Sequence, residues 1–166
     1  MRSGRDMARN VAEAAKLIRQ ASAEGAAFVS TPEMTNIMEP DRPRLRAIAR
    51  TEAEDESVRH FADLAGELGI WLNIGSLALK GARDKLVNRS FLFMPDGEVA
   101  ARYDKIHLFD ADLPSGESLR ESHAYEGGAS AVLAETAIAP IGLTICYDVR
   151  FPYLYRALAK AGAKLF

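Results

Sequence analysis

The sequence has one cysteine, one tryptophan, no large excess of either charge and no long apolar run. Because Cys146 is the only cysteine, no disulfide can form within the chain, which fits a reducing compartment. Lys and Arg number 21 and Asp and Glu number 23, so the net charge is −2. This balance argues against binding to nucleic acid or to an anionic membrane surface. No segment approaches the ~18 apolar residues of a membrane span, and residues 1–9 lack the apolar centre of a signal peptide, so we expect a cytoplasmic protein.

The overall composition of the chain is typical of a globular protein. The chain has 166 residues, of which 48% are hydrophobic and 27% charged, which excludes a collagen, a coiled coil or a disordered chain. Residues 36–44 are predicted to be a loop, and residues 104–128 form a long polar segment of a kind that is usually functional. Helical spacing of apolar residues and short apolar runs predict helices over residues 6–25, 57–68 and 151–161, and strands over residues 26–30, 70–79, 86–94, 98–103, 131–134 and 138–145.

The alternation of helices with buried strands predicts a layered α/β domain. A helix comes first with no strand before it, and a strand that begins at residue 163 stops at residue 166. We therefore expect a domain that is incomplete at both ends. Unpaired strand edges and incomplete burial would favour aggregation, so we expect the intact gene product, and not this fragment alone, to be active.

Three predicted strands are each followed by one reactive side chain, namely Glu33, Lys105 and Cys146. Taken singly, these have ordinary explanations: a surface carboxylate, a solvated loop lysine and a buried core cysteine. Cys146, however, stands at a strand-to-helix turn, where backbone N–H groups and a helix N-terminus favour a thiolate and a developing oxyanion. The repeated placement at strand ends indicates that the three side chains form one reactive site.

Three motifs resemble the nitrilase superfamily, the carbon–nitrogen hydrolases. They are T-P-E-M at residues 31–34, Y-D-K-I-H-L-F-D at residues 103–110 and I-C-Y-D-V-R-F-P at residues 145–152. Residues 88–103 are also similar to the hairpin that leads to the family lysine. The second and third motifs are most similar to the Nit branch, the ω-amidase and deaminated-glutathione-amidase relatives. The resemblance implies an αββα sandwich that commonly pairs into a homodimer, here without its first strand and its C-terminal part.

The resemblance also implies roles for these side chains. Cys146 would be the nucleophile, Glu33 the general base, and Lys105 the cation that stabilises an oxyanion together with the backbone N–H of Tyr147. The substrate would be a small linear amide that bears a carboxylate, and water would hydrolyse a cysteine thioester to complete the release of ammonia. Nitriles and N-carbamoyl amines are the alternative substrates within the superfamily, and a non-catalytic binding domain is the alternative outside it.

The family carries a second glutamate in the loop after the lysine. Glu117, Glu121 and Glu126 are the candidates in this sequence. The context of Glu121, which lies 121 − 105 = 16 residues after Lys105, resembles the Nit branch most. The resemblance therefore implies that Glu121 is the residue that holds the lysine, with Glu117 as the alternative.

Residues around the cysteine are candidates for substrate contacts. Arg150 either pairs with Asp148 to hold the turn or binds a substrate carboxylate, and the sequence leaves both open. Phe109 and Tyr147 are candidates to line the acyl pocket.

No cofactor or metal is expected. The three histidines and one cysteine are scattered without metal-ligand spacing. We interpret His107 as a structural hydrogen-bonding residue and His60 and His123 as surface residues. The pair Gly127-Gly128 lacks the other glycines of a phosphate-binding loop.

Overall fold

The computed structural model describes residues 1–82 and 84–166. Within them, no helix is both long and apolar enough to cross a membrane. The helices are α1 (Met7–Ala23), α2 (Arg42–Ile48), α3 (Glu56–Leu68) and α4 (Pro152–Lys160), with short 3₁₀ turns η1 (Glu121–His123) and η2 (Cys146–Arg150). The strands are β1 (Phe28–Ser30), β2 (Trp71–Lys80), β3 (Leu86–Phe93), β4 (Val99–Asp104), β5 (Asp110–Asp112), β6 (Ser118–Arg120), β7 (Val132–Ala134) and β8 (Ile141–Leu143).

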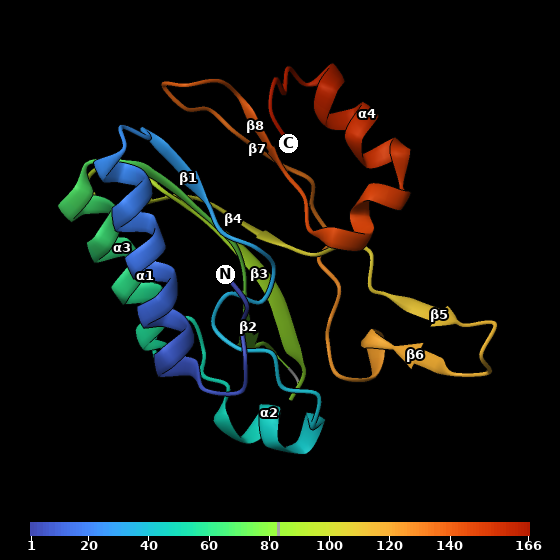
Figure 1. The fold of residues 1–166 in the computed structure, drawn as a ribbon. Helices are drawn as coiled ribbons and strands as arrows, with labels where there is room; N and C mark the ends of the chain where they lie inside the picture. The colour runs from blue at the N-terminus through green and yellow to red at the C-terminus, as the bar shows by residue number, and fades with distance from the viewer. Residues whose placement is uncertain (83) are drawn as a thin grey trace.

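The elements stack in four layers (Figure 1). A four-stranded sheet has the order β1-β2-β3-β4, with β1 parallel to β2 and the other neighbours antiparallel. Helices α1 and α3 cover one face of this sheet, the antiparallel pair β7–β8 lies over the other face, and α4 packs outside that pair. The predicted α/β fold with an αββα order of layers is confirmed.

Two apolar clusters hold the layers together. Ile18 of α1 and Phe61 of α3 pack against Leu72 of β2 in the first cluster, and all three are buried. The second cluster joins Leu92 on the opposite face of the sheet to Ile141 of β8. Because successive side chains of a strand point to opposite faces, β3 serves both cores, with Phe91 and Phe93 in the first cluster and Leu92 in the second.

The residues at the helix ends explain where α1 begins and α3 stops. Asp6 caps α1 by accepting a hydrogen bond from the backbone N–H of Arg9. Gly69 ends α3 in the left-handed conformation with a φ of 63°, which glycine adopts without the steric cost of a Cβ atom.

The loop predicted over residues 36–44 is wrong at its end, because α2 begins at Arg42. Asp41 caps this helix by accepting a hydrogen bond from the N–H of Arg44, and Pro43 lies in its first turn. A proline there needs no N–H donor, so it starts the helix and does not break it. The strand predicted over residues 138–145 is also shorter, since only Ile141–Leu143 pairs with β7.

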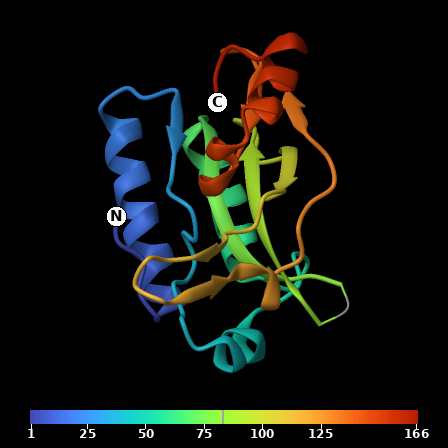
Figure 2. The same cartoon turned by 90° about the vertical axis from the view of Figure 1, so that its right-hand side faces the viewer.

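The polar segment over residues 104–128 contains more structure than predicted. Strands β5 and β6 form an antiparallel hairpin that runs directly into η1. Figure 2 shows the hairpin, in gold, across the front of the molecule with α2 in cyan below it. The Nη2 atom of Arg42 donates a hydrogen bond to the backbone oxygen of Arg120 over 2.7 Å, which ties α2 to the end of this hairpin.

The turn that carries Glu33 is fixed to an irregular part of β2. The pairing of β2 with β3 shifts register between Ile74 and Leu77. There Ser76 accepts a hydrogen bond at Oγ from the N–H of Met34 and one at its carbonyl oxygen from the N–H of Thr35. A Cβ atom at Gly75 would overlap the carbonyl oxygen of Thr31, so glycine allows the two segments to approach this closely.

Candidate active site

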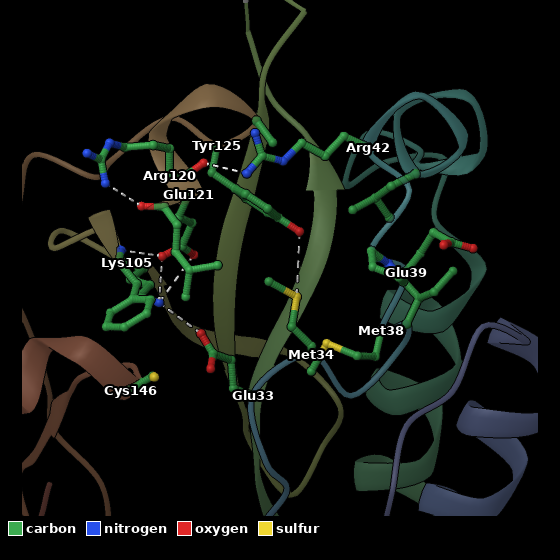
Figure 3. Close-up of a pocket in the computed structure, with 16 residues that line it drawn as sticks. Glu33, Met34, Met38, Glu39, Arg42, Lys105, Arg120, Glu121, Tyr125 and Cys146 are labelled. Carbon is green, nitrogen blue, oxygen red and sulfur yellow. Dashed lines mark hydrogen bonds and ion pairs between the residues drawn. The ribbon is translucent and has the colours of Figure 1, made fainter. Parts of the chain in front are cut away.

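Four segments far apart in the sequence deliver one side chain each to a single cavity. Glu33 follows β1, Lys105 follows β4, Glu121 begins η1, and Cys146 begins η2 after β8. All four line a cavity of about 370 Å³, and Figure 3 shows the two glutamates on either side of the Lys105 ammonium with the Cys146 sulfur beside them. The structure therefore brings together the residues that the three strand-end motifs and the loop after Lys105 single out.

Lys105 is held between two carboxylates. Its Nζ atom lies 3.1 Å from Oε1 of Glu33, and 3.2 Å and 3.0 Å from the two carboxylate oxygens of Glu121. Only 3% of the Lys105 side chain is exposed. Burial disfavours the charged form, but the charges of Glu121 and then Glu33 outweigh it, so the pKa of Lys105 is raised. The side chain is an ammonium ion at neutral pH.

Each carboxylate is itself positioned by a second donor. The Oε1 atom of Glu33 accepts a hydrogen bond of 2.7 Å from the side-chain amide of Asn88 on β3. The Oε2 atom of Glu121 accepts one of 2.6 Å from the N–H of Phe109. Sequence reasoning missed the role of Asn88, although an asparagine within a predicted buried strand is a signal of a buried polar contact.

Cys146 is exposed and has a φ of 46°. This is the left-handed region, which a residue with a side chain rarely adopts and which commonly marks a functional site. The surrounding protein desolvates the sulfur and, with the nearby charge of Glu33, raises the pKa of the thiol, although the Lys105 ammonium opposes the shift. This shift favours the protonated thiol in the resting site, against the prediction that the turn favours a thiolate.

Asp148 connects the cysteine turn to the lysine segment. Its buried carboxylate accepts hydrogen bonds from the Tyr103 hydroxyl over 2.6 Å, from the N–H of Ile145 over 2.9 Å and from the N–H of His107 over 3.1 Å. The Nδ1 atom of His107 lies 2.6 Å from the same carboxylate, and its ring stacks on Phe151 at a centroid distance of 3.6 Å. The residues on both sides of Lys105 are thus bonded to the turn that carries Cys146.

The structure shows which of the other predicted site residues lie at the cavity. Phe109 lines the cavity, and the ring of Tyr147 packs edge-on against it at a centroid distance of 4.9 Å. Arg150 is exposed and is not among the lining residues, and the ion pair with Asp148, one of the two alternatives, does not form in the described parts of the chain. Glu117 is exposed in the turn between β5 and β6, so Glu121 is the glutamate that contacts Lys105.

Two of the three histidines lie on the surface. His60 and His123 are exposed, as predicted. Among residues 1–82 and 84–166, no group of three or more His, Cys, Asp or Glu side chains could hold a metal ion.

The chain matches a protein family and resembles individual known proteins. Residues 1–166 match the model of the carbon-nitrogen hydrolase family. The chain is 32% identical to the deaminated glutathione amidase of Yersinia enterocolitica, over 98% of this chain and 57% of that protein. It is 36% identical to the omega-amidase NIT2 of Homo sapiens, over 94% of this chain and 55% of that protein. The chain thus spans little more than half the length of these relatives.

Solved structures share the fold. The C. elegans NitFhit protein superimposes with a TM-score of 0.90 at 31% identity, over 99% of this chain and 41% of that chain. Saccharomyces cerevisiae Nit3, a member of branch 10 of the nitrilase superfamily, superimposes with a TM-score of 0.82 at 29% identity, over 97% of this chain and 58% of that chain.

Replacing Asp148 with asparagine is expected to destabilise the protein by about 2–4 kcal/mol, because the amide nitrogen would face donors that the carboxylate now satisfies. Urea unfolding measures this loss. The control is Asp110→Asn, whose carboxylate is exposed and accepts hydrogen bonds from Ser122. Equal stability of Asp148→Asn and the unaltered protein would show that the Asp148 contacts do not hold the two segments together.

The alkylation of Cys146 by iodoacetamide is expected to rise with pH to a midpoint above that of a free thiol, because the pKa of Cys146 is raised. Glu33→Gln removes a charge that raises this pKa, so the midpoint should fall. Lys105→Met removes the charge that lowers it, so the midpoint should rise. The rate is followed by mass spectrometry after circular dichroism has verified folding.

The control for the two pH shifts is Glu117→Gln, which removes an exposed carboxylate outside the cavity lining and should leave the midpoint unchanged. Shifts of the same sign in Glu33→Gln and Lys105→Met would contradict the electrostatic account of the site.

Proposed function

The chain belongs to the carbon–nitrogen hydrolase family, and from this we propose that the protein hydrolyses small linear amides that bear a carboxylate, with release of ammonia. The observation that carries the proposal is the buried Lys105 ammonium between Glu33 and Glu121, in the same cavity as the Cys146 thiol. A nucleophile, a base and a fixed positive charge within one cavity are the groups that acyl transfer needs.

The first half of the reaction forms a thioester. Glu33 takes the proton of the Cys146 thiol as the sulfur bonds to the carbonyl carbon of the amide. The C=O electron pair moves onto oxygen, where the Lys105 ammonium and the backbone N–H of Tyr147 stabilise the negative charge. Glu33 then gives its proton to the amide nitrogen, the C–N bond breaks, and ammonia leaves.

The second half returns the enzyme to its starting state. Glu33 takes a proton from a water molecule while the water oxygen attacks the thioester carbon. The C–S bond breaks, the carboxylic acid departs, and the proton returns to the sulfur of Cys146. Because the thiol is protonated in the resting site, Glu33 is required in both halves. Glu121 positions the ammonium throughout.

Two further observations support an amide as the substrate. The two relatives compared above carry the names deaminated glutathione amidase and omega-amidase. The wall of the cavity includes the apolar side chains of Ile37, Phe109 and Leu119, which suit the methylene chain of a linear amide. We further propose that the protein acts in the cytoplasm as a homodimer and needs no cofactor.

Replacing Cys146 with alanine is expected to lower the rate of ammonia release from ω-amides by about a thousandfold or more, because no thioester can form. The fold should persist, since Cys146 is exposed. Ammonia release from a panel of ω-amides, deaminated glutathione, nitriles and N-carbamoyl amines measures both the loss and the substrate class.

Val149→Ala is the matched control, because Val149 is 63% exposed, lies in the same turn and does not line the cavity. Its rate should equal that of the unaltered protein. Appreciable turnover by Cys146→Ala would refute the nucleophile, and turnover of nitriles or N-carbamoyl amines in place of amides would refute the substrate class.

A further inference from the structure

The end of the cavity remote from Cys146 carries an arginine without an acidic partner. Arg42, the first residue of α2, lines the cavity, and its one hydrogen bond goes to the backbone oxygen of Arg120. No carboxylate in residues 1–82 and 84–166 forms an ion pair with Arg42. Its guanidinium group keeps its positive charge and most of its donors for another ligand.

The other charges at this end are already neutralised. Arg120 pairs with Asp112 over 2.6 Å. Glu39, whose side chain is fully buried, lies 3.6 Å from Arg5 and 3.3 Å from Arg44. In Figure 3, Arg42 extends toward Arg120 and Tyr125, whereas the carboxylate of Glu39 points away from them. Among the described residues that line the cavity, Arg42 is therefore the charged side chain that has no ion-pair partner.

The end of the cavity that holds Lys105 and Cys146 has an excess of negative charge. The ammonium of Lys105 is surrounded by the carboxylates of Glu33 and Glu121, which gives one positive and two negative charges. A negatively charged group on a ligand is repelled from this end and attracted to the other. Met34, Ile37 and Leu119 contribute apolar surface to the wall of the cavity.

We propose that Arg42 determines specificity by binding a carboxylate at the end of the substrate opposite to the amide. The proposal rests on the proposed amidase function for the position of the amide, and it assigns the carboxylate contact to Arg42 and not to Arg150. Arg150 is exposed and outside the cavity lining, whereas Arg42 is part of that lining. A planar guanidinium can bind a carboxylate through two parallel hydrogen bonds.

The test measures binding without turnover. Calorimetry on the full chain with Cys146→Ala compares the monoamide of glutaric acid, which carries a distal carboxylate, with its methyl ester, which is neutral. We expect the acid to bind more tightly than the ester. Adding Arg42→Gln should weaken binding of the acid about tenfold, the loss typical of one charge-assisted hydrogen-bonded contact, and leave the ester unchanged. Added KCl should reduce the preference, because Arg42 is exposed.

The matched control is Arg150→Gln, which removes an exposed arginine close to Cys146 in the chain. The protein that carries Cys146→Ala and Arg150→Gln should bind the acid as tightly as the protein that carries Cys146→Ala alone. Equal affinity for acid and ester, no binding of either, an unchanged affinity in Arg42→Gln, or a loss in Arg150→Gln would each overturn the assignment.

Hydrolysis by the unaltered protein is measured in parallel and separates the two proposals. If the acid binds through Arg42 but no amide is hydrolysed, the proposed function fails and the anion site stands. If amides are hydrolysed with no dependence on Arg42, the proposed function stands and the anion site fails.

Discussion

The candidate site depends on a buried ammonium ion that needs two carboxylates. Lys105 has almost no contact with solvent, and burial alone would favour its neutral form. Glu33 and Glu121 reverse that preference, because each lies within 3.2 Å of Nζ. Removing either carboxylate would leave a charge that is poorly compensated in a low-dielectric environment. The segments that carry the three residues are therefore constrained to meet, and the cavity forms where they do.

The cysteine is joined to this cluster by a separate set of contacts. Asp148 accepts hydrogen bonds from residues on both sides of Lys105 and from the residue before Cys146. Burial and Asp148 raise the pKa of Tyr103, so its hydroxyl remains a donor to that carboxylate. The backbone of Cys146 holds a left-handed φ while the sulfur stays protonated. Asp148 thus fixes the turn that carries the thiol relative to the segment that carries the positive charge, and Glu33 is the group that faces both.

The sequence was sufficient to predict a layered α/β domain and the convergence of Glu33, Lys105 and Cys146, because apolar periodicity locates strands and reactive residues follow strand ends. The αββα order of the layers came from the resemblance to the nitrilase superfamily. It did not predict that Arg42 faces the cavity, since Pro43 suggested a loop and only the fold shows which way α2 lies. The raised pKa of the Cys146 thiol could not be predicted from the sequence either. Its sign depends first on how far the protein desolvates the sulfur and then on the distances of the sulfur from a carboxylate and an ammonium, which motifs do not encode.

The most direct test of the account is the pKa of the Lys105 side chain, measured by NMR titration of its Cε and Nζ signals in the folded protein. The account predicts a value above the 10.5 of an unperturbed lysine, and a lower value when Glu121 is replaced by glutamine. A pKa well below 10.5 in the unaltered protein would mean that burial outweighs the two carboxylates, and it would contradict a fixed positive charge at the centre of the site.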